Sequence, residues 1–339
     1  MRKLLLILLV LSFSALNFAG DESRKGTSGA DQLLIPVGAQ SIATAGAFLS
    51  RVSGVEALYY NPAGLDLMTG TEAMFNYMSY IADIGISYFA IGTQLGDLGS
   101  VALSFKTVNF GDIPITTFEN PDGTGAFYSP TFYVAALSYS KAVTDRVSAG
   151  FNFKIINEAI LQTSATGIAL DFGVQYRFNN NLSLAAVVKN IGTNMNYTGE
   201  DLKIKSDIPG GALESGSGVF ESDTETFQIP SFFELSFAYN FNMDEQNNLA
   251  VASTFRNNNN FEDEILAGLE YSFMNLFFLR GGYNYLVENN SDSIYGFTLG
   301  AGINYVTTGG MAFVFDYAFR DVKEFDSANH IFTVKIAFE

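Results

Sequence analysis

The sequence predicts an all-β fold, a 14-stranded antiparallel transmembrane β-barrel that holds an N-terminal plug. Three observations lead to this prediction. The chain contains a succession of strand-like segments of membrane-spanning length, these segments carry large aromatic side chains on one face, and the connections between them alternate between short and long. The composition agrees, because 32 Phe, 17 Tyr and 32 Gly against 7 Pro favour many strands joined by tight turns.

The first residues have the composition of a secretory signal peptide. Arg2 and Lys3 form a charged start, and residues 4–13 form an apolar core that is too short to remain as a membrane-spanning helix. Ala19 is a suitable small residue at a cleavage site. We therefore expect residues 1–19 to be a signal peptide and the mature chain to begin directly after it.

Residues 20–72 are expected to form a plug, or hatch, inside the barrel. Between residues 26 and 70 the chain is rich in Gly and Ala, whose small side chains let backbones pack closely, and residues 40–49 are expected to form a short helix. A flexible linker is the alternative. It is opposed by the many apolar side chains that a linker would leave in water, namely Leu33, Leu34, Ile35, Val37, Phe48, Leu58, Tyr59 and Tyr60.

The plug is expected to end in a hinge formed by Asn61, Pro62, Ala63 and Gly64. The residue before a proline is pushed toward extended geometry, so Asn61 should be extended, whereas Pro62 lacks a backbone donor and Gly64 can adopt a positive φ. An ordinary turn that enters the first strand is the alternative. The four residues alone do not decide between the two.

Residues 73–339 are expected to form the barrel. Most strand candidates have the roughly 9–11 residues that a tilted membrane-spanning strand needs, whereas strands of soluble proteins usually have about 5–6. The candidates are 73–81, 84–95, 98–108, 129–140, 145–157, 166–178, 181–190, 229–241, 248–256, 262–273, 275–286, 293–305, 309–320 and 329–338.

Alternation places large apolar side chains on one face of these strands and small or polar ones on the other. This pattern is typical of a membrane barrel with a lipid-facing apolar band, aromatic girdles and a polar interior. Because the sequence contains no Trp, the girdles would consist of Tyr and Phe. The pattern is clearest at Phe233, Leu235, Phe237, Tyr239, Phe241, Met311, Phe313, Phe315, Tyr317, Phe319, Phe332, Val334, Ile336 and Phe338.

The predicted connections differ in length at the two ends of the barrel. Those after even-numbered strands are uniformly short, at 96–97, 141–144, 179–180, 242–247, 274 and 306–308. Those after odd-numbered strands include every long segment, at 82–83, 109–128, 158–165, 191–228, 257–261, 287–292 and 321–328. Outer-membrane barrels have short periplasmic turns and long extracellular loops, so this asymmetry favours such a barrel with both chain ends on the periplasmic side.

Composition also argues against several classes of function. A net charge of −17 is unfavourable for nucleic-acid binding, and a chain with no Cys has neither disulfides nor thiolate metal sites. Histidine-dependent catalysis would have to rely on His330, which we expect near a loop or the membrane interface, and no G-x-S-x-G motif is present. We therefore expect no enzymatic activity, no cofactor and no metal site.

Two long connections are candidate binding surfaces. The segment 109–128 is unusually apolar and is expected to fold over the barrel mouth, to form its lip, or simply to extend two strands; its candidate residues are Phe110, Ile113, Phe118 and Phe127. The segment 191–228 is acidic, and it is expected to dock a basic partner, to bind a divalent cation weakly, or to be a solvated loop. Its candidate residues are Glu200, Asp201, Glu221, Asp223 and Glu225.

The stretches Pro36 to Ala47 (PVGAQSIATAGA) and Gly54 to Leu65 (GVEALYYNPAGL), followed by about 14 strands, resemble the FadL-type outer-membrane barrels, and most closely their PorV/PorQ branch. The resemblance implies an N-terminal hatch in a 14-stranded barrel. For FadL-type members it implies passage of hydrophobic compounds. For PorV-type members it implies a role in type IX secretion, in which exported proteins are received and delivered to the attachment machinery at the cell surface.

These observations predict a non-catalytic outer-membrane protein that acts as a docking or shuttle subunit in type IX protein secretion and surface attachment. Its partners would be outer-membrane lipid, secretion-system subunits and exported client proteins. The alternative is a FadL-like passive channel for hydrophobic small molecules, with the plug controlling entry. A porin-like protein without a dedicated partner is a third possibility. No nucleic-acid partner is expected.

Overall fold

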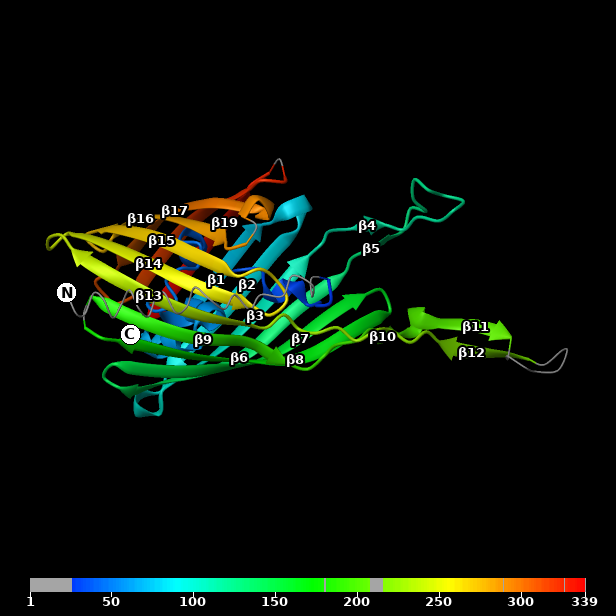
Figure 1. Ribbon diagram of the computed structural model, residues 1–339, viewed down its shortest axis with the longest axis horizontal. Coiled ribbons are helices and arrows are strands. Elements are labelled where there is room, and N and C mark those ends of the chain that lie inside the picture. The colour runs from blue at the N-terminus through cyan, green and yellow to red at the C-terminus, as the bar shows by residue number, and fades with distance from the viewer. Residues whose placement is uncertain (1–25, 180, 208–215, 289, 326, 339) are drawn as a thin grey trace.

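The computed structural model describes residues 26–179, 181–207, 216–288, 290–325 and 327–338, so the predicted signal peptide lies outside the described residues. Fourteen long strands form a closed antiparallel barrel, which confirms the predicted fold class (Figure 1). They are β1 (Thr71–Ser79), β2 (Gly85–Gln94), β3 (Ser100–Asn109), β6 (Thr131–Thr144), β7 (Val147–Ile160), β8 (Thr163–Arg177), β9 (Leu182–Gly192), β13 (Phe232–Asn242), β14 (Asn247–Asn258), β15 (Glu264–Phe273), β16 (Phe277–Leu286), β17 (Tyr295–Val306), β18 (Ala312–Val322) and β19 (Asn329–Phe338).

The barrel closes where its first strand pairs with its last. β1 and β19 are antiparallel neighbours from Thr71 opposite Phe338 to Ser79 opposite His330. The remaining barrel strands pair in chain order around the wall, and a register shift interrupts the pairing of β8 with β9. Every strand therefore has a partner on both sides, and the wall has no free sheet edge.

The strand candidates are all present, with ends that differ by a few residues. The clearest error is the predicted connection 158–165. The β7–β8 ladder continues to Ile160 opposite Thr163, so only Leu161 and Gln162 join the strands, and Leu161 adopts the positive φ that a two-residue hairpin turn needs. The two strands are longer than a membrane-spanning strand needs to be. The expected strand length therefore placed the end of β7 and the start of β8 wrongly.

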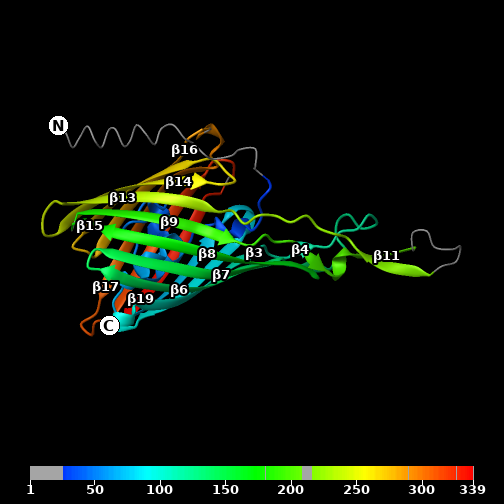
Figure 2. The same ribbon diagram turned by 60° about the horizontal axis from the view of Figure 1, so that its bottom comes forward.

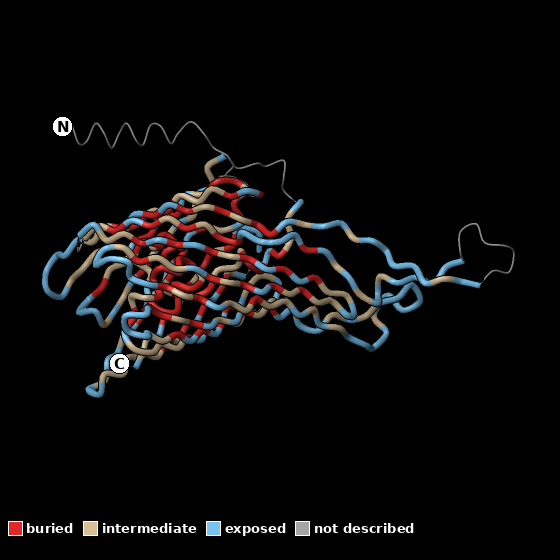
Figure 3. The backbone as a smooth tube through the Cα atoms, turned by 90° about the horizontal axis from the view of Figure 1, so that it is seen from below, coloured by how far each residue is buried: buried red, intermediate tan, exposed pale blue. Residues whose placement is uncertain are grey.

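The outward face predicted from alternation is also present. Phe237, Phe315 and Phe332 expose 48%, 53% and 54% of their surface, while their neighbours Asp316 and Thr333 are buried on the opposite face. Figure 3 shows the buried residues gathered within the barrel and the exposed ones over the projecting connections. The barrel therefore presents a band of large apolar side chains to its surroundings and keeps polar groups inside.

The polar interior is organised into ion pairs between neighbouring strands. Arg280 on β16 binds Glu270 and Asp316, each at 2.6 Å, and the side chains of Arg280 and Asp316 are only 3% and 1% exposed. Pairing of this kind offsets part of the cost of burying these charges. The other interior pairs are Lys154 with Asp171 at 2.6 Å, and Arg256 with Glu234 at 2.8 Å and with Glu264 at 2.9 Å.

The plug consists of short helices between residues 31 and 67, and it occupies the lumen. Its elements are η2 (Asp31–Leu33), α2 (Ala39–Ala43), η3 (Gly54–Glu56), α3 (Ala57–Tyr60) and η4 (Pro62–Leu67). α2 packs against β16 to β19, and η4 packs against β6 to β8 on the other side of the barrel. The plug therefore spans the lumen between two walls. Within the described residues, no helix has the length and hydropathy needed to cross a membrane.

The helix predicted over residues 40–49 is much shorter than expected. α2 ends at Ala43, because Ala45 and Gly46 both have positive φ values and the Thr44 hydroxyl donates to the Ser41 carbonyl. A left-handed backbone cannot continue a right-handed helix.

Short elements occupy the connections. β4 (Ile113–Pro114) pairs with β5 (Phe127–Tyr128), and β11 (Lys203–Asp207) pairs with β12 (Ser217–Glu221), while β10 (Thr198–Gly199) adds to β8. Figures 1 and 2 show that both hairpins project away from the same end of the barrel. Single turns of 3-10 helix are η5 (Ile81–Asp83), η6 (Gly96–Leu98), η7 (Glu200–Leu202) and η8 (Asn290–Asp292).

Candidate functional site: the plug and the cavities beside it

Asn61 links the plug to the barrel wall. Its side chain is fully buried, and its Nδ2 donates to the carbonyl oxygens of Leu49, at 3.1 Å, and Val174 on β8, at 3.3 Å. Its Oδ1 accepts the Ala63 amide at 3.1 Å and so caps η4, which begins at Pro62. Asn61 is extended (φ −151°, ψ 104°), as expected of a residue before proline.

Glycines in the wall make room for this part of the plug. A Cβ added at Gly150 on β7 would overlap the Pro62 backbone, and one at Gly173 on β8 would overlap the Asn61 Oδ1. Gly64 does not use the positive φ that the sequence suggested. It is required for space instead, because a Cβ there would overlap the carbonyl oxygen of Val52.

We expect Gly173→Ala to displace the plug from β8, because the new methyl group occupies the space of the Asn61 amide. Overpacking of this kind typically costs about 1–3 kcal/mol. The measurement is protease resistance of the plug in the folded barrel. Gly281→Ala on β16 is the matched control, since its Cβ would meet no atom closer than 3.6 Å. Equal resistance in the two variants would contradict the assignment of this contact.

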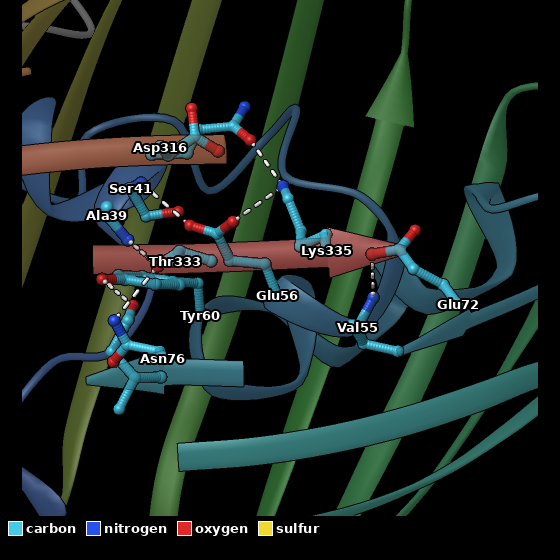
Figure 4. A network of polar contacts seen from close by, with 12 residues as sticks. Ala39, Ser41, Val55, Glu56, Tyr60, Glu72, Asn76, Asp316, Thr333 and Lys335 are labelled. Atoms are coloured by element: carbon cyan, nitrogen blue, oxygen red, sulfur yellow. Dashed lines mark hydrogen bonds and ion pairs between the residues drawn. The ribbon is translucent and has the colours of Figure 1, made fainter. Parts of the chain in front are cut away.

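A buried ion pair joins the other side of the plug to the wall (Figure 4). Lys335 Nζ on β19 lies 3.0 Å from Glu56 Oε2, and their side chains are 11% and 1% exposed. The same ammonium donates to Gln40 Oε1 at 2.9 Å, and the Ser41 amide donates to Glu56 Oε1 at 2.9 Å. The carboxylate thus connects η3, α2 and β19 at a single point.

Hydrogen bonds on the same strands reinforce this link. The Ala39 amide at the start of α2 donates to Thr333 Oγ1 at 2.8 Å, and Asn76 Nδ2 on β1 donates to the same oxygen at 3.1 Å. The Val55 amide donates to Glu72 Oε1 at 3.2 Å. Figure 4 shows these contacts side by side. All of the wall partners lie on β1 and β19, the two strands that close the barrel.

The charge of Glu56 depends on its partners. Burial by itself would raise the pKa of the carboxyl, but the Lys335 ammonium and the hydrogen bonds from Ser41 outweigh burial and hold the pKa below its usual range. Glu56 is therefore ionised at neutral pH. Its ion pair and its hydrogen bonds depend on that negative charge.

A cavity of about 420 Å³ lies between the plug and the wall, next to the long connections. The plug contributes the apolar surface of Ile42 and the rings of Tyr59 and Tyr60. The wall and connections contribute mainly apolar and aromatic groups together with several charged ones, including Tyr80, Arg256, Phe261, Glu262, Leu266, Leu286, Ile294, Tyr295 and Arg320. This composition suits a ligand with a large apolar part and a small polar part.

Arg320 supplies much of the polar chemistry of this cavity. Its guanidinium lies 4.0 Å from the centre of the Tyr295 ring, and the amide oxygen of Asn329, once oriented as an acceptor, takes hydrogen bonds from its Nε at 3.1 Å and Nη2 at 2.8 Å. None of the carboxylates that the structure describes forms an ion pair with it. The hydroxyls of Tyr80 and Tyr295 are hydrogen-bonded at 2.6 Å beside it.

A second cavity, of about 960 Å³, lies beside the short turns at the opposite end of the barrel. Here the plug contributes Ser50, Arg51 and Leu67, and the wall contributes residues 145–146, 177–179 and 181–183 with Tyr239 and Asn240. The plug therefore lies between two cavities that face opposite ends of the lumen.

The predicted apolar loop residues do not lie together. Phe110 packs on Phe132 at the base of the connection, with ring centres 4.9 Å apart. Phe118 and Phe127 are exposed on the projecting β4–β5 segment, and Ile113 is half-buried on β4. The expectation that this connection folds over the barrel mouth is wrong. The β4–β5 pairing and the contacts at its base direct it outward (Figure 1).

The predicted acidic residues have different environments. Glu200 binds the nearby Lys203 at 2.6 Å within the connection, and the Asp201 carboxylate accepts the Gln162 amide at 2.8 Å, so Asp201 joins the connection to the turn between β7 and β8. Glu221, Asp223 and Glu225 are exposed. Among the described residues, no three His, Cys, Asp or Glu side chains are placed to bind a metal ion together.

The lining of the first cavity was not predicted from the sequence. Arg320 lies on the face opposite the aromatic side chains of its strand, and Arg256 occupies an inward position of the same kind. Arginine is rare at inward-facing strand positions, and this rarity could have identified both residues as candidates. Tyr80 and Tyr295 lie at the ends of strands, where alternation no longer tells which way a side chain points.

The fold is similar to that of solved hydrocarbon channels and transporters. Aligned with a CymD monoaromatic hydrocarbon channel, the chain has 13% identity and a TM-score of 0.55, with 89% of this chain and 97% of that chain covered. With the Ralstonia pickettii toluene transporter TbuX the identity is 13% and the TM-score 0.56, and the alignment covers 90% of this chain and 99% of that chain. With a Pseudomonas aeruginosa FadL homologue the identity is 12% and the TM-score 0.55, and the alignment covers 89% of this chain and 98% of that chain.

No protein-family model matches the chain, and no curated protein matches it. The similarity to the solved structures therefore concerns the fold, which this chain shares with FadL-type barrels. None of the three structures is described as a PorV or PorQ protein.

Proposed function

We propose that this protein is a non-catalytic channel of the outer membrane that lets hydrophobic compounds enter, with residues 20–72 acting as a hatch inside the barrel of residues 73–339. The observation that carries the proposal is the cavity of about 420 Å³ between the plug and the long connections. The apolar outer band supports the membrane location, and the fold shared with the toluene transporters supports the class of function.

The cavity favours a compound with an aromatic or aliphatic body. Its volume lies within the range of roughly 300–1,000 Å³ that is usual for small-molecule sites. Tyr59, Tyr60 and Leu266 offer surfaces on which such a body can pack. Arg320, stacked on Tyr295, would contact a carboxylate, a hydroxyl or the face of an aromatic ring at the polar end.

The plug would control passage. The Asn61 and Glu56 contacts with the wall are unlike each other, because the Asn61 side depends on close packing with β7 and β8, whereas the Glu56 side depends on charge. In this proposal Asn61, Pro62, Ala63 and Gly64 stay in place as the hinge. The part of the plug that carries α2 moves to open a path between the two cavities.

The direct test is uptake of radiolabelled toluene by cells that lack their own channels for hydrophobic compounds. We expect several-fold faster uptake with the protein than with an empty vector. Ile294→Trp, at the rim of the cavity, should slow uptake by narrowing the entrance. Leu299→Trp, on the outer face with 52% exposure, should leave it unchanged. Uptake that does not depend on the protein would rule out a toluene channel.

The second candidate is the docking or shuttle role of PorV-type proteins in type IX secretion. Two observations favour it, namely the sequence resemblance over residues 36–65 and the exposed apolar side chains on the projecting hairpins, among them Phe118, Ile204 and Val219. Gentle affinity purification from native outer membranes, followed by mass spectrometry, tests this role. Secretion-system subunits and exported clients would favour docking, whereas the barrel with a bound hydrophobic compound would favour the channel.

A further inference from the structure

The cavity beside the short turns is lined by three arginines from separate parts of the chain. Arg51 belongs to the plug, Arg146 to the turn between β6 and β7, and Arg177 to the end of β8. The remaining lining consists mainly of neutral polar groups, with Asp145 as the acidic member: Ser50, Leu67, Asp145, Phe178, Asn179, Asn181, Leu182, Ser183, Tyr239 and Asn240. Three guanidinium groups on one cavity are notable in a chain with a net charge of −17.

These arginines lack the carboxylate partners that Arg256 and Arg280 have. Arg51 donates to the amide oxygen of Asn240, and Arg177 donates to the carbonyl oxygen of Asp145 at 3.5 Å. None of the three forms an ion pair with a described residue, whereas Arg256 and Arg280 each bind two carboxylates.

The positive charge of Arg51 is unfavourable in its partly buried position. Burial lowers the pKa of its guanidinium, and a more distant carboxylate, Glu270, offsets this only in part. A charge that is partly buried and has no counter-ion is stabilised by an anion that binds beside it. The cavity of about 960 Å³ has room for such an anion and opens at the end of the barrel.

We propose that this cavity is a binding site for an oxyanion of the phosphate class. A guanidinium presents parallel N–H donors that match two oxygens of a phosphate group, and such charge-assisted hydrogen bonds are stronger than neutral ones. The source is either a free phosphate or the headgroup of an anionic phospholipid from the leaflet at this end of the barrel. This site is separate from the cavity proposed for hydrophobic compounds.

Anion binding here has a consequence for the plug. Arg51 lies on the plug, and Arg146 and Arg177 lie on the wall, so an anion between them would connect the two. A ligand that binds only the closed arrangement stabilises that arrangement by mass action. The bound anion should therefore increase the protease resistance of the plug.

The test uses the full-length barrel with two probes. Inorganic phosphate is titrated calorimetrically into the protein in a neutral detergent, and native mass spectrometry records which lipid the protein retains from a mixed bilayer of phosphatidylglycerol and phosphatidylcholine. Arg146→Gln with Arg177→Gln removes two guanidinium groups and their two positive charges. Lys203→Gln with Lys205→Gln removes the same charge from the exposed strand β11 and serves as the control.

We expect binding of phosphate, preferential retention of phosphatidylglycerol, or both, with a loss of at least about tenfold in the arginine variant and no change in the lysine control. Phosphate binding identifies a free anion as the source, and retention of phosphatidylglycerol alone identifies the lipid headgroup. The proposal is overturned if the wild-type protein shows neither, or if both double variants behave alike. Arg146→Gln alone, at an exposed turn position, is the variant to use should the double arginine variant not fold.

Discussion

Lys335→Met is expected to free the plug from the wall formed by β1 and β19. The substitution removes the ammonium that lies 3.0 Å from Glu56 and leaves a carboxylate buried without its counter-ion. Breaking a buried ion pair from one side typically costs about 3–5 kcal/mol. We expect the plug, over residues 30–68, to become sensitive to protease and the cells to become permeable to a bulky antibiotic.

Two further variants make this result interpretable. Lys323→Met removes a lysine from an exposed position after β18 and should change neither property. Glu56→Gln combined with Lys335→Met removes both charges, so it should recover part of the resistance that the single variant loses. A Lys335→Met protein with the protease resistance of the wild type would show that the ion pair does not hold the plug.

The same ion pair predicts how the wild-type plug responds to acid. The pKa of Glu56 is held below its usual value of 4.5, so the carboxylate stabilises the folded plug fully above that value. The contribution is lost as the pH falls through the lowered pKa. The plug should therefore resist protease at neutral pH and become accessible only below about pH 4.5.

Phe315→Arg is expected to impair assembly of the barrel. Phe315 lies within β18 with 53% of its surface exposed on the apolar outer face. A charged side chain at the middle of a bilayer costs about 2–4 kcal/mol in a membrane barrel. The yield of folded protein in the outer-membrane fraction, read from its heat-dependent migration on a gel, measures this effect.

Phe325→Arg is the matched control, because it makes the same chemical change in the connection after β18, at a position with 41% exposure. Assembly should then remain close to that of the wild type. If Phe315→Arg assembled as well as Phe325→Arg, the outer face of the barrel would not lie in hydrocarbon, and the proposed membrane location would be wrong.

The barrel was predictable because its signal is local. Residues such as Leu235 and Ser236 point to opposite sides of one strand, and this alternation repeats over segments long enough to identify strands and faces together. The extended backbone of Asn61 was predictable for the same reason, since the proline beside it fixes the choice.

The plug contacts were not predictable, because their partners are far apart in the sequence. Glu56 and Lys335 are separated by 279 residues, and no local pattern connects them. The need for glycine at positions 64 and 173 comes from close approach in the folded protein, although the sequence suggested backbone freedom at Gly64. The cavity beside Arg320 likewise depends on how the plug fills the lumen.

The projecting hairpins escaped prediction for a different reason. All five residues of β11 are exposed, so the strand has no buried face and its sequence has no apolar alternation. It pairs with β12 in antiparallel register, from Lys203 opposite Glu221 to Asp207 opposite Ser217. Apolar alternation identifies strands that have one buried face, so it cannot identify a strand such as β11, whose residues are all exposed.

Closure of the barrel between β1 and β19 also constrains the order in which the chain assembles. The strand that holds the plug through Lys335 is synthesised last, whereas the plug itself precedes the first strand. A finished wall has no opening wide enough to admit the folded plug from the side, since every strand is paired on both edges. The plug therefore enters either while the sheet is still open or through an end of the barrel. In the folded protein its polar contacts with β1 and β19 connect the first and last strands of the sheet. The pairing of these two strands closes the longest loop in the barrel, and the entropic cost of loop closure grows with loop length.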